Sequence, residues 1–222
     1  MSFIEQIKQR AKQEIKTIVL PEATDVRILE AAEMIKNEGY AKVILIGNEE
    51  EVRKLAKERN IDIGETKIID PAVSIETARY SKELYELRKS KGMTEEQAEK
   101  LVLEPVYFGM MMVKLNEADG LVSGAAHSTS DTLRPALQIL KTAPGTKLVS
   151  AFFVMVVPNC KYGENGTFIF ADSGLNEEPD SEKLSEIAIS SSKSFEQLVG
   201  TQPKVAMLSY STYGSAHSAS TE

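Results

Sequence analysis

The sequence predicts an α/β fold built around a doubly wound parallel sheet. Two short apolar runs, residues 17–21 (TIVLP) and 41–47 (AKVILIG), have the pattern of strands that are buried on both faces. Residues 27–37 between them have the apolar spacing of a helix. Asn48 then caps a second, charged helix, and a weaker strand follows at residues 67–70. This βαβαβ order is typical of a doubly wound sheet.

Helices precede and follow this alternating segment. Residues 1–16 carry charges throughout, which indicates an amphipathic helix and not a signal peptide with an apolar centre. A long helical stretch covers residues 74–90 and then 94–103. Thr94 opens its second part, and Gln97 stands three residues later, so the two form a capping box.

A methionine-rich helix and a further strand come next. Pro105 starts the helix, which contains three consecutive methionines at positions 110–112. A run of methionines in a helix is far more often core or interface packing than a cofactor contact, and we interpret this run as packing. The strand at residues 118–122 leads into residues 123–141, SGAAHSTSDTLRPALQILK.

The last third of the chain predicts part of a second α/β domain. Residues 147–158 and 168–172 have the pattern of strands around a GENG turn, and Asp180 caps a helix that ends near residue 199. Residues 204–211 predict one more strand. We place the domains at residues 1–146 and 147–222, and expect elements of both to be missing. A unit that stops after its strand leaves a sheet face uncovered, so we expect the chain to continue beyond residue 222.

Composition limits the classes of function. The 222 residues are 42% hydrophobic, enough for a full core. The net charge of −7 and the pI near 5.1 argue against nucleic-acid or anionic-membrane surfaces, which need clustered Lys and Arg. Cys160 is the only cysteine, so we expect no disulfide framework, no metal cage and a reducing compartment. The longest apolar run, residues 151–158, is shorter than the roughly 20 residues of a membrane span. We therefore expect a cytoplasmic protein.

The loop that follows the strand at residues 118–122 concentrates groups that bind anions. Small residues let backbone amides approach an anion, and a helix start offers free N–H groups and a positive dipole end. Pro135 fits near such a start if Asp131 or Thr132 is the helix cap. Arg134 adds a planar fork that matches phosphate. The predicted phosphate ligands are Ser128, Thr129 and Arg134, beside Gly124, His127 and Ser130.

A second loop of similar composition lies at residues 209–218 (SYSTYGSAHS), with Ser211 and Tyr213 in it. Each loop alone is also compatible with an ordinary serine-rich helix cap. The fingerprints G-x-x-x-x-G-K-[ST], G-x-G-x-x-G and G-x-S-x-G are all missing from the sequence. Two such loops favour a transfer reaction on a small phosphorylated substrate over nucleotide hydrolysis, dinucleotide binding or serine hydrolysis.

Four motifs in order, YELRKSKGMTEEQA, ADGLVSGAAHSTSDTLRPALQILKT, FADSGLNEEPDSEKLSEIAI and MLSYSTYGSA, resemble the phosphate acetyltransferase family. The resemblance covers essentially the whole chain. It implies a two-domain fold like that of the isocitrate and isopropylmalate dehydrogenases, a homodimer, and an active site between the domains. The implied reaction moves an acetyl group reversibly between acetyl phosphate and coenzyme A in acetate metabolism, with coenzyme A as a substrate and no bound cofactor.

The resemblance also assigns roles to residues. The two substrate-binding arginines of the family correspond to Arg88 in ELRKSKG and Arg134 in TLRPAL, and Cys160 corresponds to a cysteine that lies near the site without being the nucleophile. Ser211 and Tyr213 fall near the site as well. Members of the family are about half as long again, and their general base lies in the C-terminal part. The resemblance thus implies no catalytic residue within residues 1–222.

Other interpretations stay open at this point. Phosphate butyryltransferases share the architecture, although they match the four motifs less closely. A chain without the general base is also compatible with an inactive fragment that binds coenzyme A or phosphate. His127 and His217 are conceivable bases, but a loop histidine more often forms hydrogen bonds or faces solvent. A decarboxylating dehydrogenase of the same fold needs metal-binding aspartates that the sequence does not display.

Overall fold

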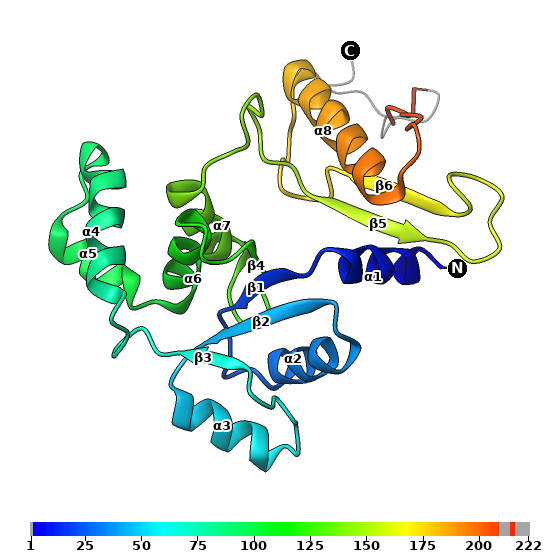
Figure 1. Ribbon diagram of the computed structural model, residues 1–222. Helices are drawn as coiled ribbons and strands as arrows, with labels where there is room; N and C mark the ends of the chain where they lie inside the picture. The colour runs from blue at the N-terminus through cyan, green and yellow to red at the C-terminus, as the bar shows by residue number, and fades with distance from the viewer. Residues whose placement is uncertain (1, 209–213, 216–222) are drawn as a thin grey trace. The chain divides into compact units, whose positions relative to one another are not determined.

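A four-stranded parallel sheet forms from the alternating apolar segments (Figure 1). Its strands are β1 (Lys16–Leu20), β2 (Ala41–Ile46), β3 (Lys67–Ile69) and β4 (Gly120–Leu121), in the order β3-β2-β1-β4. Every neighbouring pair runs parallel. The predicted α/β class and its strands are confirmed, although β4 is shorter than the predicted strand at residues 118–122.

This computed structural model describes residues 2–208, 214 and 215. The chain divides into two compact units, one of residues Lys8–Lys141 and one of Thr142–Glu222 with Met1–Ile7. The predicted domain boundary after residue 146 stays a prediction.

The sheet has an apolar cluster on each face. Alternate residues of a strand point to opposite faces, and β1 shows this directly, since Val19 belongs to one buried cluster and Leu20 to the other. Ile44 and Leu45 divide in the same way in β2. Both faces of these two strands are therefore covered, which explains why their sequences are continuously apolar.

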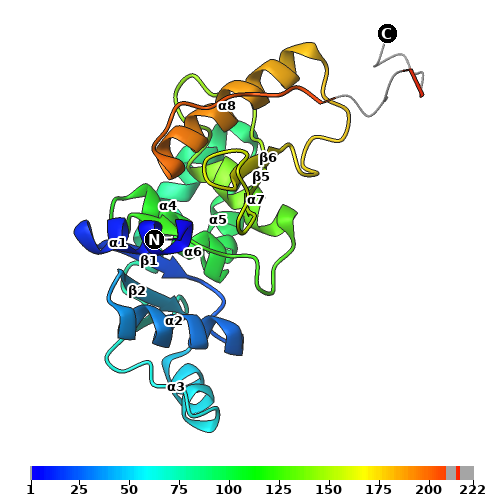
Figure 2. The ribbon, with the colours of Figure 1, turned by 90° about the vertical axis from the view of Figure 1, so that its right-hand side faces the viewer.

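Six helices supply the two clusters. One cluster includes residues of α2 (Val26–Glu38) and α3 (Glu49–Glu58). The other includes residues of α4 (Thr77–Arg88), α5 (Glu95–Val102), α6 (Pro105–Lys114) and α7 (Thr129–Ile139). A short 3-10 turn, Lys89–Lys91, follows α4. Figure 2 shows α2 and α3 on one side of the strands and α4 to α7 on the other.

Local sequence signals explain where these helices begin. Asn48 caps α3 by accepting a hydrogen bond from the Glu51 amide at 3.1 Å. Thr94 and Gln97 form the predicted capping box of α5, in which each side chain accepts a hydrogen bond from the other's backbone amide. The methionines at positions 110–112 are buried in the core, which confirms that they pack.

The amphipathic helix expected at the N-terminus is α1 (Phe3–Gln13). Within the larger unit, Lys8 of this helix forms an ion pair with Glu38 at the end of α2, with 2.7 Å between Nζ and Oε1. None of the helices in the described part of the chain has the length and apolarity that a membrane span requires.

The smaller unit contains an antiparallel strand pair and a long helix. Strands β5 (Phe152–Val156) and β6 (Thr167–Ala171) pair with Val154 opposite Ile169, and α8 (Ser181–Val199) begins at the predicted cap, Asp180. The strand predicted at residues 204–211 is wrong for residues 204–208, which have no regular structure, and its remainder lies outside the described residues. The cross-strand pair Phe153 and Phe170 is 60% and 56% exposed, so this hairpin presents an apolar face.

Candidate substrate-binding site

The carboxyl ends of β1 and β4 place two chain segments side by side. The two strands are neighbours and parallel, so the segment that follows each of them emerges at the same edge of the sheet. Glu22 follows β1, and the loop of residues 123–128 follows β4. Residues about a hundred positions apart in sequence therefore meet at one end of the sheet.

Helix α7 begins at this loop, earlier than the sequence suggested. Ser128 is its N-cap and accepts a hydrogen bond from the Asp131 amide at 3.2 Å. The predicted caps, Asp131 and Thr132, are therefore wrong, because the hydroxyl of Ser128 already satisfies a first-turn amide. Pro135 consequently lies inside the helix, where it cannot donate to the carbonyl of Asp131. It is buried in the packed face of α7.

The predicted phosphate ligands Ser128 and Thr129 both lie at the head of α7, and both are exposed. The Ser128 hydroxyl also contacts Asp131 Oδ2 at 2.6 Å and Ser130 Oγ at 2.9 Å. Among the described residues, the amides of Thr129 and Ser130 donate no hydrogen bond to a group outside the helix. The head of α7 thus leaves two N–H groups that no described group outside the helix satisfies.

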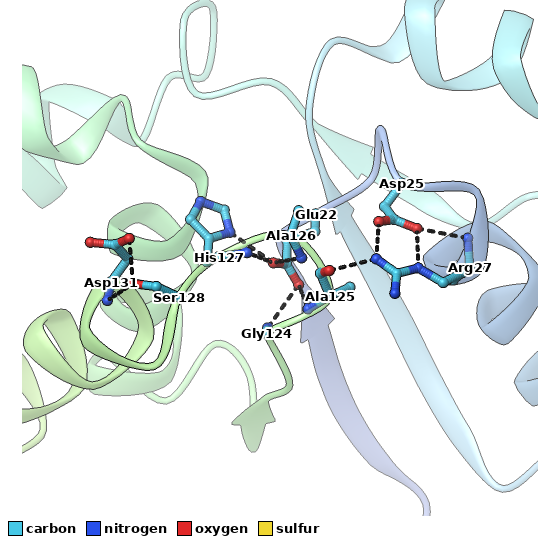
Figure 3. Close-up of polar contacts among 9 residues, drawn as sticks. All are labelled: Glu22, Asp25, Arg27, Gly124, Ala125, Ala126, His127, Ser128 and Asp131. Atoms are coloured by element: carbon cyan, nitrogen blue, oxygen red, sulfur yellow. Dashed lines mark hydrogen bonds and ion pairs between the residues drawn. The ribbon is translucent and has the colours of Figure 1, made fainter.

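The amides of the loop before α7 already hold an anion, the carboxylate of Glu22 (Figure 3). Oε2 accepts hydrogen bonds from the amides of Gly124 and Ala125 at 2.9 and 3.0 Å. Oε1 accepts from the amides of Ala126 and His127, both at 2.8 Å. These four amides are therefore already satisfied by a side chain of the protein itself. Sequence analysis missed Glu22 because a single acid after a strand gives no sign of its distant partner.

A side chain of helix α2 also holds the loop of residues 123–128 in place. Arg27, in the first turn of α2, donates a hydrogen bond to the carbonyl of Ala125 at 2.5 Å and pairs with Asp25 at 2.6 Å (Figure 3). Asp25 in turn caps α2 by accepting from the Arg27 amide at 2.9 Å. The cap of α2 and the loop after β4 are consequently linked through one guanidinium group.

Glu22 is ionised over the whole physiological range. Burial on its own raises the pKa of a carboxyl group, and the Glu22 side chain is only 2% exposed. The hydrogen bonds from the loop amides and from His127 outweigh burial and lower the pKa of Glu22 from 4.5 to about 2. The loop is therefore built around a permanent negative charge.

Acid is expected to destabilise the protein through Glu22. Because the pKa is lower in the folded state, the unfolded chain binds the proton more readily, and this contribution is complete above about pH 4.5 and is lost as the pH falls toward 2. Between neutral pH and about pH 3 the free energy of unfolding should fall by about 2 kcal/mol from this group alone. Urea unfolding of the wild type and of Glu22→Gln at both pH values measures it. Parallel losses in the two proteins would contradict the assignment.

The two predicted arginines both act electrostatically on one tyrosine, Tyr107. Arg88 ends α4 and is half-buried, and Arg134 lies exposed on α7. Burial raises the pKa of the Tyr107 phenol, and the positive charges of Arg134 and Arg88 both act against that rise. Tyr107 on α6 donates a hydrogen bond to Gln138 at 2.9 Å, one turn beyond Arg134. The charges of Arg88 and Arg134 thus both act on one residue of α6.

Neither guanidinium group has a hydrogen-bond or ion-pair partner among the described residues. This contrasts with Arg27, Arg53 and Arg79, each of which pairs with a carboxylate. In the described part of the chain four buried hydroxyl oxygens also lack a hydrogen-bond partner: Ser123 Oγ, Thr132 Oγ1, Ser150 Oγ and Ser191 Oγ. The guanidinium groups of Arg88 and Arg134 are therefore available to pair with an anionic ligand.

The other predicted residues are placed only in part. Cys160 is a half-buried free thiol after β5 in the smaller unit. Ser211, Tyr213 and His217 lie outside the described residues. Within residues 2–208, 214 and 215, no group of three or more His, Cys, Asp or Glu side chains could hold a metal ion. Two open hollows of about 500 and 550 Å³ border β3 and β2, and neither is lined by a predicted site residue.

Comparison with known proteins gives the family of the chain. A family model described as "Phosphate acetyl/butaryl transferase" matches residues 2–222. The chain belongs to this family. Within the transferase family, it is 64% identical over 222 residues to the phosphate acetyltransferase of Acetivibrio thermocellus. It is 51% identical over 216 residues to the phosphate acetyltransferase of Thermoanaerobacterium thermosaccharolyticum.

Solved structures agree with this membership of the transferase family. A phosphotransacetylase from Streptococcus pyogenes aligns with a TM-score of 0.87 at 37% identity and covers 99% of this chain and 66% of its own. The EutD phosphotransacetylase from Staphylococcus aureus gives a TM-score of 0.84 at 44% identity, with 98% and 63% covered. The two sequence matches cover 100% and 97% of this chain, and 66% and 65% of the relatives. The chain therefore spans slightly less than two thirds of these relatives' length.

Proposed function

We propose that this chain takes part in the reversible transfer of an acetyl group between acetyl phosphate and coenzyme A, with release of inorganic phosphate. The observation that carries the proposal is its 64% identity, over all 222 residues, to a protein named phosphate acetyltransferase. The role that we propose for residues 1–222 in this reaction is to bind the anionic groups of the substrates.

The arginines are the groups that fit this role. A protein with a net charge of −7 must hold a phosphate by local positive charge. Arg134 is exposed, lacks a described partner, and lies on the helix whose head keeps the amides of Thr129 and Ser130. We assign Arg134 to the leaving phosphate, with Ser128 and Thr129 beside it. Arg88 then serves either that phosphate or a phosphate of coenzyme A.

The chemistry explains why positive charge is needed. The thiol of coenzyme A loses its proton, and the thiolate attacks the carbonyl carbon of acetyl phosphate. A carbon–sulfur bond forms, the bond between that carbon and the phosphate oxygen breaks, and phosphate leaves with both bonding electrons. A guanidinium group that neutralises the departing oxygens lowers the barrier to this step. The resemblance assigns the general base that accepts the thiol proton to chain outside residues 1–222.

The finer features of the family are part of the proposal. We propose a two-domain fold of the isocitrate and isopropylmalate dehydrogenase type, which the strand order β3-β2-β1-β4 with helices on both faces supports. A homodimer in the cytoplasm, with coenzyme A as a substrate and no bound cofactor, completes it. Cys160, Ser211 and Tyr213 are proposed to lie near the site.

An assay of thioester formation tests the reaction. The 222-residue chain is mixed with coenzyme A and either acetyl phosphate or butyryl phosphate, and calorimetry measures binding of coenzyme A and of inorganic phosphate in parallel. Thioester from acetyl phosphate at the higher kcat/KM supports the proposal. Preference for butyryl phosphate would move the assignment to a butyryltransferase. Binding without thioester is the result for an inactive binding chain, and no binding of either ligand would refute the proposal.

A further inference from the structure

Besides the four backbone amides, the carboxylate of Glu22 contacts one side chain, the ring of His127. Oε1 lies 2.8 Å from Nδ1 of His127, the ring that directly precedes the cap of α7 (Figure 3). The same oxygen accepts the hydrogen bond from the His127 backbone amide. The backbone and the ring of His127 are thus held by a single carboxylate oxygen.

This contact fixes which ring nitrogen carries the proton. With a pKa of about 2, Glu22 is ionised at neutral pH and can only accept hydrogen bonds. A contact of 2.8 Å to Nδ1 therefore requires the proton on Nδ1. The remaining nitrogen, Nε2, keeps its lone pair in the neutral ring. In Figure 3 it points away from Glu22, and the side chain is 32% exposed.

We propose that Glu22 is a positioning residue that presents His127 Nε2, at the head of α7, as a hydrogen-bond acceptor for a donor group of coenzyme A. The inference rests on the proposed function for the identity of this ligand. An acceptor nitrogen suits the amide N–H, hydroxyl or thiol groups of coenzyme A. It does not suit the oxygens of phosphate dianion, which the two N–H groups of the helix head and Arg134 match instead.

The loop and the start of α7 thus offer separate groups to coenzyme A and to phosphate. The carboxylate of Glu22 fills the amides of residues 124–127, so they cannot also bind phosphate. What the loop offers a ligand is then one oriented imidazole, followed directly by Ser128 and the free amides of Thr129 and Ser130. We expect His127 to affect coenzyme A and the head of α7 to affect phosphate.

Imidazole nitrogen NMR reads the tautomer without any ligand. The sequence has two histidines, so the ¹⁵N spectrum contains two ring systems, and a His217→Asn variant assigns them. When its ring is neutral, His127 should carry its proton on Nδ1 and none on Nε2. Glu22→Gln should remove this preference. A wild-type His127 with a proton on Nε2 would overturn the proposal.

Calorimetry with coenzyme A and with inorganic phosphate tests the acceptor. His127→Asn places an amide N–H close to the position of Nδ1, so it retains the donor to Glu22 and removes only Nε2. The dissociation constant for coenzyme A should rise about fivefold in this variant, as expected for one neutral hydrogen bond, while that for phosphate stays at the wild-type value. Wild-type affinity for coenzyme A in His127→Asn, or an equal loss for both ligands, would overturn the proposal.

These two experiments distinguish a failure of the proposed role of Glu22 and His127 from a failure of the proposed acetyltransferase function. If the wild type binds no coenzyme A, the proposed function fails and so does the ligand named here, while the NMR result still decides whether Glu22 orients His127. Glu22→Gln leaves an amide NH₂ facing backbone N–H groups and can prevent folding. If Glu22→Gln does not fold, two other variants replace it in these experiments. They are Glu22→Asp, which keeps the negative charge on a shorter side chain, and His127→Asn.

Discussion

Arg134→Ala is expected to weaken the binding of inorganic phosphate by about 30-fold, because charge-assisted hydrogen bonds to phosphate contribute about 2 kcal/mol. The side chain is exposed and has no described partner, so its removal should leave the free energy of unfolding unchanged. Calorimetric titration of the 222-residue chain with phosphate, with urea unfolding as the check on the fold, measures both quantities.

Two further variants make the Arg134 experiment specific. Arg134→Lys keeps the positive charge but loses the planar fork, and we expect it to recover only part of the affinity. Arg53→Ala removes an arginine of α3 that is paired with Glu49 at 2.8 Å, and phosphate affinity should not change. Equal losses in Arg134→Ala and Arg53→Ala would indicate a general charge effect. An unchanged affinity in Arg134→Ala would remove this residue from the site.

Gly166→Ala is expected to reduce the free energy of unfolding by about 3 kcal/mol or more, since positive-φ strain and overpacking add. Gly166 lies before β6 with φ of +85°, and a Cβ there would sit 2.1 Å from the carbonyl oxygen of Val157. That oxygen belongs to backbone and cannot rotate away as a side chain would. The carbonyl of Gly166 also accepts the Val157 amide at 2.9 Å, so any shift breaks the end of the hairpin.

Gly145→Ala is the matched control for this substitution. Gly145 has a similar φ of +80°, but an added Cβ meets nothing within 4 Å. It should therefore show the backbone strain alone, about 1 kcal/mol. Urea unfolding, followed by a probe of the smaller unit, gives the difference between the two variants, which isolates the clash. Similar losses in both would mean that the hairpin relaxes around the new methyl group.

Local signals predicted most of the larger unit. The caps at Asn48 and Thr94 were readable because a cap and the amide that it satisfies lie within three residues of each other. The strands β1 and β2 were readable because burial on both faces makes them continuously apolar. The methionine-rich helix was interpreted correctly as packing for the same reason, since apolar residues on all sides of α6 are buried.

The contacts that build the candidate site are long-range, and local patterns do not reveal them. Glu22 meets its loop amides across more than a hundred residues, and Tyr107 meets Gln138 across 31. Pro135 misled the prediction because proline favours a helix start, whereas Ser128 supplies a better cap seven residues earlier. Residues 204–208 are apolar after Lys204, but a strand also needs a partner to pair with, and a single segment cannot show whether one is present.

The four amides that surround Glu22 also bear on how this part of the molecule can open. Any movement that withdraws the carboxylate leaves an unpaired buried charge and releases four N–H donors at once, so small partial displacements are all unfavourable. The loop should consequently behave as one cooperative unit that is either closed or locally unfolded. The loop is therefore already ordered before a ligand binds. Because its conformational entropy was lost when the chain folded, ordering the loop does not reduce the binding free energy of the ligand.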